Sequence, residues 1–191
     1  MSKHSKQKTF YTSRVNAKSI IAIFAIVIVF VVFAVLALDG IFAGSKIPAT
    51  SDEVWNAIEE QGYIPEDISA FYYQKDSGFK LTLKKCIAFE SEDIHFEFFE
   101  FNNRDSAIDI YGQAYHDITT TYNSWQKMEI SHKASNYSLY FLDSLGKYNV
   151  AIFVENTAVY ATCNSENQSK INRILDPIDY LQFGNNKEKT E

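Results

Sequence analysis

The stretch Asp93 to Phe101, which reads DIHFEFFEF, decides the fold class of this chain. Apolar and polar residues alternate along it, so Ile94, Phe96 and Phe98 share one face of an extended strand. The alternation slips at Phe98-Phe99, which either a β-bulge or a strand buried on both faces explains. We therefore predict a strand that lies within a sheet.

The residues around this strand predict a hairpin followed by a helix. Leu81 to Phe89 alternates partly and predicts the preceding strand, with a turn at Glu90 to Glu92. After the hairpin, apolar residues at helical spacing predict a helix from Asp105 to Thr121. The same order of hairpin and helix returns from Tyr148 to Leu175 and indicates a pseudo-repeat.

The outer segments supply the remaining elements. Thr50 and Glu53 predict a capping box at the start of a helix that Gly62 ends. Pro65 to Phe79 mixes aromatic and charged residues and predicts a loop or short turn, and Ser165 is the expected N-cap of the last helix. Further strands are expected at Tyr137 to Leu142, Tyr148 to Val154 and Ala158 to Cys163, with a weaker one at Trp125 to Ile130.

Without the weaker strand, the order of elements is α-β-β-α-β-β-β-α. This order predicts an α+β fold in which an N-terminal transmembrane helix is followed by one antiparallel sheet with helices packed on one face.

The transmembrane helix is predicted from an apolar run of 19 residues, Ile20 to Leu38. As a helix the run would be about 28 Å long, close to the thickness of the hydrocarbon core of a bilayer. Five Lys and Arg residues and no acidic residue precede Ser19, and Asp39 follows the run. Since positive flanks stay inside, we expect a single-pass protein of the cell membrane with a cytoplasmic N-terminus and an extracellular C-terminal domain.

The predicted organisation has five segments: a basic tail at 1–18, a signal-anchor helix at 19–38, a linker at 39–50, an extracytoplasmic domain at 51–183 and a loose polar tail at 184–191. Two alternatives stay open. Val35-Leu36-Ala37 can serve as a signal-peptide cleavage site, although signal peptides have shorter apolar cores, of about 7–15 residues. Gly40 to Gly44 spells GxxxG, a helix-dimerisation pattern, but a linker explains the same residues.

The charge of the chain limits its partners. After the apolar run there are 13 Lys and Arg against 24 Asp and Glu, a net charge of −11. Because an acidic domain repels phosphate backbones, we expect no nucleic-acid partner. The expected partners are the lipid bilayer, through residues 20–38, and another envelope or membrane protein.

Two cysteines, Cys86 and Cys163, both fall in predicted strands of the exported part. A disulfide persists outside the cell, and it forms if the two strands are neighbours in a suitable register. We therefore expect the cysteines to lie near each other across the sheet. Whether they are bridged or remain two buried free thiols is left open.

The acidic segment around Glu92, His95 and Glu97 is the one candidate for a metal site or for acid-base chemistry, together with Glu90 and Asp93. His95 and Glu97 project from the same face of one strand. A metal site needs three or more converging ligands, and the solvated face of an acidic sheet explains the same residues. The usual nucleophile, zinc-protease, thiol-redox and nucleotide-binding motifs are missing, so we expect no catalytic residues and no cofactor.

Three short features carry a resemblance to a known group of proteins. They are the helix that ends at Gly62, the Ser106-Ala107 helix start after an aromatic-acidic strand, and Val154 to Ala161 before the last helix. On these features, Ser51 to Tyr180 resembles uncharacterised membrane-anchored extracytoplasmic proteins of Gram-positive bacteria. The resemblance implies a location and a fold but no activity. We expect a membrane-tethered extracytoplasmic binding or interaction domain, with an envelope enzyme or metal-binding domain that uses the acidic carboxylates as the alternative.

Overall fold

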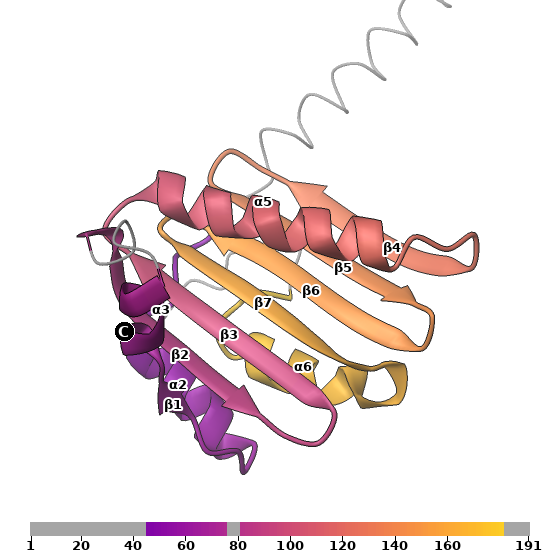
Figure 1. Cartoon of the computed structure of the whole chain (residues 1–191), viewed down its shortest axis with the longest axis horizontal. Helices are drawn as coiled ribbons and strands as arrows, with labels where there is room; N and C mark the ends of the chain where they lie inside the picture. The colour runs from indigo at the N-terminus through magenta and orange to yellow at the C-terminus, as the bar shows by residue number, and fades with distance from the viewer. Residues whose placement is uncertain (1–44, 76–80, 182–191) are drawn as a thin grey trace, which may run out of the picture. The chain divides into compact units, whose positions relative to one another are not determined.

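The computed structural model describes residues 45–75 and 81–181. Within these ranges the strands form one seven-stranded antiparallel sheet in the order β1-β2-β3-β7-β6-β5-β4 (Figure 1). The strands are β1 (Glu66–Asp67), β2 (Leu83–Glu90), β3 (Ile94–Phe101), β4 (Lys127–Lys133), β5 (Tyr137–Ser144), β6 (Lys147–Val154) and β7 (Thr157–Asn164). The helices are α2 (Ser51–Glu60), α3 (Ser69–Lys75), α5 (Arg104–Thr121) and α6 (Gln168–Leu175), with a 3-10 turn, η1, at Ser165–Asn167.

Every helix and strand predicted for the domain at 51–183 is present in the predicted order, and the weaker strand exists as β4, but the structure adds β1 and α3 between α2 and β2. The expected loop from Pro65 to Phe79 is wrong in part, because the described residues of this segment form β1 and α3. β1 extends the sheet by pairing with β2, and Ser69 at the start of α3 donates from its hydroxyl to Asp67. This local hydrogen bond, at 2.6 Å, starts a helix without an apolar repeat long enough to predict one.

Helices cover both faces of the sheet, so the prediction that they pack on one face is wrong. Figure 1 shows α3 and α5 in front of the strands and α2 and α6 behind them. Along β7, Val159 and Ala161 pack with α2 and α6, whereas the alternate residues Ala158 and Tyr160 pack on the opposite face. The physical reason is that the central strands are apolar on both faces, and each face needs its own cover.

Strand β3 shows why a layer of helices is needed on each face of the sheet. Phe98 is 0% exposed and Phe99 is 2% exposed, although they point to opposite faces. Pairing with β2 runs without interruption through both residues, so the slip in alternation marks a strand buried on both faces. The irregularity in this pair lies instead between Leu83 and Lys85.

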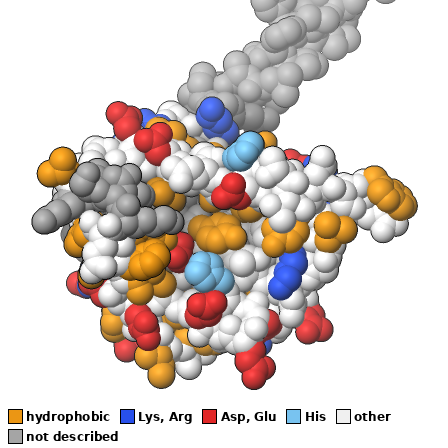
Figure 2. Space-filling view, in the orientation of Figure 1, with side chains coloured by type: hydrophobic (Ala, Val, Ile, Leu, Met, Phe, Trp, Pro, Cys, Tyr) orange, Lys and Arg blue, Asp and Glu red, His pale blue; other side chains and the backbone are white. Residues whose placement is uncertain are grey.

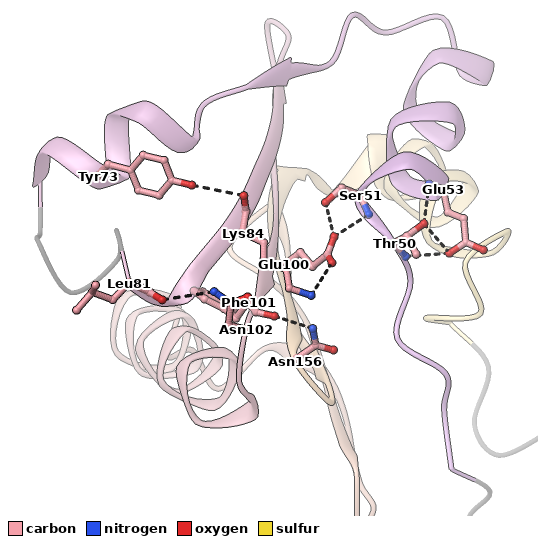
Figure 3. Close-up of polar contacts among 10 residues, drawn as sticks. All are labelled: Thr50, Ser51, Glu53, Tyr73, Leu81, Lys84, Glu100, Phe101, Asn102 and Asn156. Carbon is pink, nitrogen blue, oxygen red and sulfur yellow. Dashed lines mark hydrogen bonds and ion pairs between the residues drawn. The ribbon is translucent and has the colours of Figure 1, made fainter.

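The predicted start of α2 is confirmed. The Thr50 hydroxyl accepts from the Glu53 backbone, and the Glu53 carboxylate accepts from the Thr50 N–H at 2.8 Å (Figure 3). Gly62 follows the helix end with φ of +81°, a conformation that glycine adopts without steric cost. The expected cap at Ser165 is wrong: its hydroxyl donates to Asp143 Oδ1 at 2.7 Å, and α6 begins only at Gln168.

The predicted proximity of Cys86 and Cys163 is also wrong. Cys86 lies in β2 and Cys163 in β7, with β3 between them. In the aligned registers Cys86 is level with Ala158, so Cys163 lies two strand spacings away, roughly 9.5 Å, and five residues further along, roughly 16 Å. The two side chains also belong to cores on opposite faces. Both are buried free thiols.

The chain enters the domain at one end of the sheet, on the face covered by α2 and α6. Lys46 is buried, forms an ion pair with Asp179, and lies over the Tyr137 ring at 5.4 Å. Ala49 donates its N–H to the Tyr180 hydroxyl at 3.0 Å. These contacts join residues 46–49 to the segment after α6.

A second set of polar contacts holds α2 on the sheet. Ser51 donates from its hydroxyl and its N–H to Glu100 of β3, at 2.7 and 3.2 Å (Figure 3). Burial by itself would raise the pKa of Glu100, but the hydrogen bonds from Ser51 and Lys84 outweigh it and lower that pKa. The carboxylate is therefore charged at neutral pH and ties α2 to β3.

The apolar run Ile20 to Leu38, the linker up to Gly44 and the tail after Leu181 lie outside the described residues. Among the helices that are described, none combines the length and the apolar character required to cross a bilayer.

Candidate functional site

An apolar groove lies between α6 and β4 and has a volume of about 230 Å³. Its lining residues are Met128, Ile130, Phe141, Asp143, Tyr148, Gln168, Asn172 and Leu181. Phe141 and Tyr148 form the buried floor, with ring centroids 6.3 Å apart. Met128 and Ile130 form the outer wall and are 67% and 44% exposed. We call this feature the α6 groove.

The groove exists because α6 is short. Its apolar residues Ile171, Ile174 and Leu175 pack in the core over the middle of the sheet. The outermost strand, β4, is exposed at almost every position on both faces. The residues of β4 that point to the α6 face therefore keep one side open to solvent, although they are apolar.

Asp143 is the one charged side chain among the groove residues that the structure describes. It accepts a hydrogen bond from the Ser165 hydroxyl at 2.7 Å. The Tyr148 hydroxyl donates to Asn172 Oδ1 at 3.0 Å, and burial raises the pKa of Tyr148. The groove thus offers an apolar floor, neutral amide groups and one carboxylate, which suits an apolar segment that carries a cation.

A second, more open hollow adjoins the groove at Met128 and Asp143. It is lined by the loop before β4 and by the β5–β6 turn, where Leu145 is 66% exposed. Trp125, in the same loop, is 90% exposed. Figure 2 shows a hydrophobic side chain that protrudes at this end of the molecule. Exposed Trp, Met and Ile side chains next to a groove are typical of binding surfaces.

The sequence candidates lie elsewhere, on the face covered by α3 and α5. His95 lies between two carboxylates: its Nε2 is 3.6 Å from Glu97 Oε1, and its Nδ1 is 4.0 Å from Glu90 Oε1. The Tyr72 hydroxyl donates to Glu97 Oε1 at 2.9 Å. Glu92 and Asp93 lie in the β2–β3 turn, where Asp93 accepts from the Asn167 side chain.

The hydrogen bond that the Glu97 carboxylate accepts from His95 raises the pKa of His95, burial lowers it, and the negative charges of Glu97 and Glu90 raise it further. His95 and Glu97 can therefore share a proton. The Tyr72 hydroxyl connects Glu97 to α3. Across residues 45–75 and 81–181, no three His, Cys, Asp or Glu side chains stand close enough together to bind a metal ion. The predicted weak ligand set Glu92, His95 and Glu97 is therefore not assembled in the described structure.

Comparisons with known proteins add little to this geometry. No family model matches the chain, and no curated protein matches it. A crystal structure described as a GTP-binding regulator from Thermotoga maritima matches with 14% identity and a TM-score of 0.42. The match covers 70% of this chain and 91% of that chain. At this level the similarity carries no argument about function.

The groove was missed from the sequence because its residues come from β4, β5, β6, α6 and the segment after α6. One local signal was present: the segment Trp125 to Ile130 places Trp, Met and Ile in a strand too weakly patterned to be a core strand. Exposed apolar residues in a weak strand indicate an edge, but Asp143 and Asn172 join them only through the tertiary fold.

Proposed function

We propose that this chain is a membrane-tethered extracytoplasmic binding domain, and that the α6 groove receives an apolar segment carrying a basic residue. The observation that carries the binding role is the open apolar groove with a single carboxylate, Asp143, at its end. The 19-residue apolar run and its basic flank support the tether and the orientation.

The place of the groove in the domain supports this role. Residues 46–49 enter at the end of the sheet where β5 begins, and Lys46 there contacts Asn136 and Tyr137. The groove lies toward the opposite end of β5, at Phe141 and Asp143. Seven residues of strand from Tyr137 to Asp143 span roughly 20 Å. The Asp143 end of the groove is thus well removed from the point where the chain enters the domain, whereas Leu181 at its other end follows Tyr180, which contacts Ala49.

Calorimetric titration with two synthetic peptides tests the binding role. A peptide of alternating Leu and Lys should bind, and one of alternating Leu and Glu should not. Asp143→Asn should weaken the first interaction about tenfold, because a charge-assisted hydrogen bond to the Lys side chain is lost. The matched control is Asp109→Asn on α5, which removes the same charge from a distant exposed site. Equal affinity of the two peptides, or an Asp143→Asn variant that binds as the wild type does, would contradict the proposal.

A reporter fused after Glu191 tests the tether. We expect an exported phosphatase reporter to be active and a cytoplasmic fluorescent reporter to be dark. The reverse pattern would overturn the orientation without affecting the groove.

A second candidate function rests on the contacts among Tyr72, His95 and Glu97, which could serve acid-base chemistry or contribute to metal binding. Thermal unfolding with and without Ca²⁺, Mg²⁺, Mn²⁺ or Zn²⁺ tests the metal-binding version. A rise in the unfolding temperature that Glu97→Gln removes would support it, and no rise with any of the four ions would exclude it.

A further inference from the structure

We propose that a second copy of this chain adds its own β4 to the open edge of β4, so that two sheets join into one about a two-fold axis at Ser131. This inference rests on the proposed binding function and names a partner for the edge strand beside the groove.

The outer edge of β4 has backbone N–H and C=O groups that can pair with another strand. The Ala134 N–H donates to the Tyr137 carbonyl at 2.9 Å, so even-numbered residues of β4 face β5 in the hydrogen-bonding direction. The odd-numbered residues, Lys127 to Lys133, therefore direct their N–H and C=O groups away from the sheet. In the described ranges β4 pairs with β5 and with no other strand. An unpaired edge of this length is a template for another strand.

Charges on β4 select the register. With Ser131 opposite Ser131 of the second copy, Glu129 lies opposite Lys133 of that copy, and the pair occurs twice by symmetry. Opposite charges directly across an antiparallel pair are stabilising. Ile130 and His132 then face each other across the same interface. Five strand residues of each copy, 129–133, are paired.

The other registers of the β4–β4 pair have less favourable charge pairs or a shorter overlap. A register centred at Ile130 places Lys127 opposite Lys133 of the second copy. A register centred at Glu129 places the two Glu129 carboxylates opposite each other. Each of these registers contains a destabilising like-charge pair. A centre at Met128 keeps opposite charges together but pairs only residues 127–129 of the strand. Among the registers that avoid like-charge pairs, the one centred at Ser131 therefore has the longest overlap.

The same symmetry suits two tethered chains. A two-fold axis perpendicular to the sheet keeps each face on its own side, so both copies present their α6 faces together. Lys46 and Ala49 pack on that face. Both chains therefore enter the joined sheet from one side, as two anchors in one bilayer require.

The dimer is closed. The opposite edge of the sheet is β1, which has two residues and offers little backbone for further pairing. Pairing of β4 with β4 uses the same patch on both copies, so it ends at two chains. A shared membrane raises the effective concentration, which lets a short strand interface form.

Cysteine cross-linking of the full chain in membranes tests the register. Ser131→Cys should give a disulfide-linked dimer under mild oxidation, because paired residues on the axis have Cα atoms about 5.5 Å apart. Lys127→Cys is the matched control on the same strand and face, and it should stay monomeric. The native thiols, Cys86 and Cys163, are buried and do not compete. Absence of the Ser131→Cys dimer, or an equal yield from Lys127→Cys, overturns the proposal.

A charge exchange tests self-association independently of cross-linking. Glu129→Lys and Lys133→Glu should each weaken self-association in membranes about tenfold, because two attractive pairs become repulsive. The double variant should restore most of the dimer, since the pairs are reformed with reversed signs. A double variant as weak as either single one overturns the proposal. Cross-linking of Ser131→Cys to a different protein would also overturn it, while leaving the binding function and its peptide titration intact.

Discussion

Tyr180 joins the first and last described segments of the domain through one buried hydroxyl. Ala49 donates its N–H to this oxygen at 3.0 Å, and the Thr157 hydroxyl is 2.5 Å from it. The side chain is 0% exposed, so neither partner can turn to water if the hydroxyl is removed. This oxygen therefore holds Ala49, while Lys46 is held separately by Asp179 and Asn136.

We expect Tyr180→Phe to lower the free energy of unfolding by about 2 kcal/mol, because it leaves the buried Ala49 N–H without an acceptor. Urea unfolding of a fragment from Ser45 to Glu191 measures this loss. The control is Tyr63→Phe, which removes a hydroxyl from a half-buried ring that stacks on Phe89. Equal losses of free energy of unfolding in both variants would show that the hydrogen bonds of Tyr180 do not stabilise the domain more than an ordinary tyrosine hydroxyl does.

The pH dependence of stability near neutrality should follow His95. Since contact with Glu97 raises the pKa of His95 above its ordinary 6.5, the folded state holds the proton more tightly than the unfolded state. The stabilisation is complete below about pH 6.5 and is lost as pH rises through the pKa of the folded state.

We therefore expect the free energy of unfolding to fall as the pH rises above about 6.5, and we expect Glu97→Gln to flatten that fall. Denaturant unfolding at several pH values measures both slopes. The control is His116→Gln, which removes an exposed imidazole from α5 and should keep the wild-type slope. A free energy of unfolding that rises with pH in the wild type would contradict the assignment of this pH dependence to His95.

At the scale of the element, the order of strands β2-β3-β7 separates the two cysteines. Burial raises the pKa of both thiols, that of Cys163 to about 11, so little reactive thiolate forms at neutral pH. Each side chain is 0% exposed in its own core.

We expect both thiols to react with a chromogenic thiol reagent only after unfolding, and two thiols per chain to be counted then. Dithiothreitol should leave the unfolding temperature unchanged, because there is no bridge to reduce. A drop in that temperature on reduction would mean that β2 and β7 are neighbours, against the described sheet order.

Helix α2 offers a second prediction at this scale. Thr50→Ala removes one half of the capping box and should cost about 1 kcal/mol of stability. Asn103→Ala at the start of α5, where the side chain accepts from Ser106 N–H at 2.9 Å, should cost a similar amount. Urea unfolding of the same fragment compares the two variants, and no loss in either would show that the caps are replaced by water.

At the scale of the whole molecule, the proposed orientation depends on the five cations before Ser19. Replacing them with Gln should produce a mixed population in which part of the C-terminal domain stays in the cytoplasm. Protease protection of intact cells separates the two populations. Replacing five exposed Lys and Arg residues of the domain instead should leave the orientation unchanged, and a uniform orientation in the first variant would contradict the role of the cations.

The sequence by itself determined the elements of this domain. The capping box at Thr50, the glycine after α2 and the alternation in β3 act between residues a few positions apart, so they are visible without the fold. The same locality explains the errors. The short α3 rests on the Asp67–Ser69 hydrogen bond, and Ser165 was expected to cap a helix because its competing acceptor, Asp143, is distant in the sequence.

Only the tertiary structure decided which elements are neighbours. Strand order, the placement of α5 and α6 on opposite faces, and the distance between Cys86 and Cys163 depend on contacts between residues far apart in the chain. No local pattern encodes these contacts, because an apolar strand face fits equally well against several neighbours. The α6 groove belongs to the same class, since it forms where a short helix leaves an edge strand uncovered.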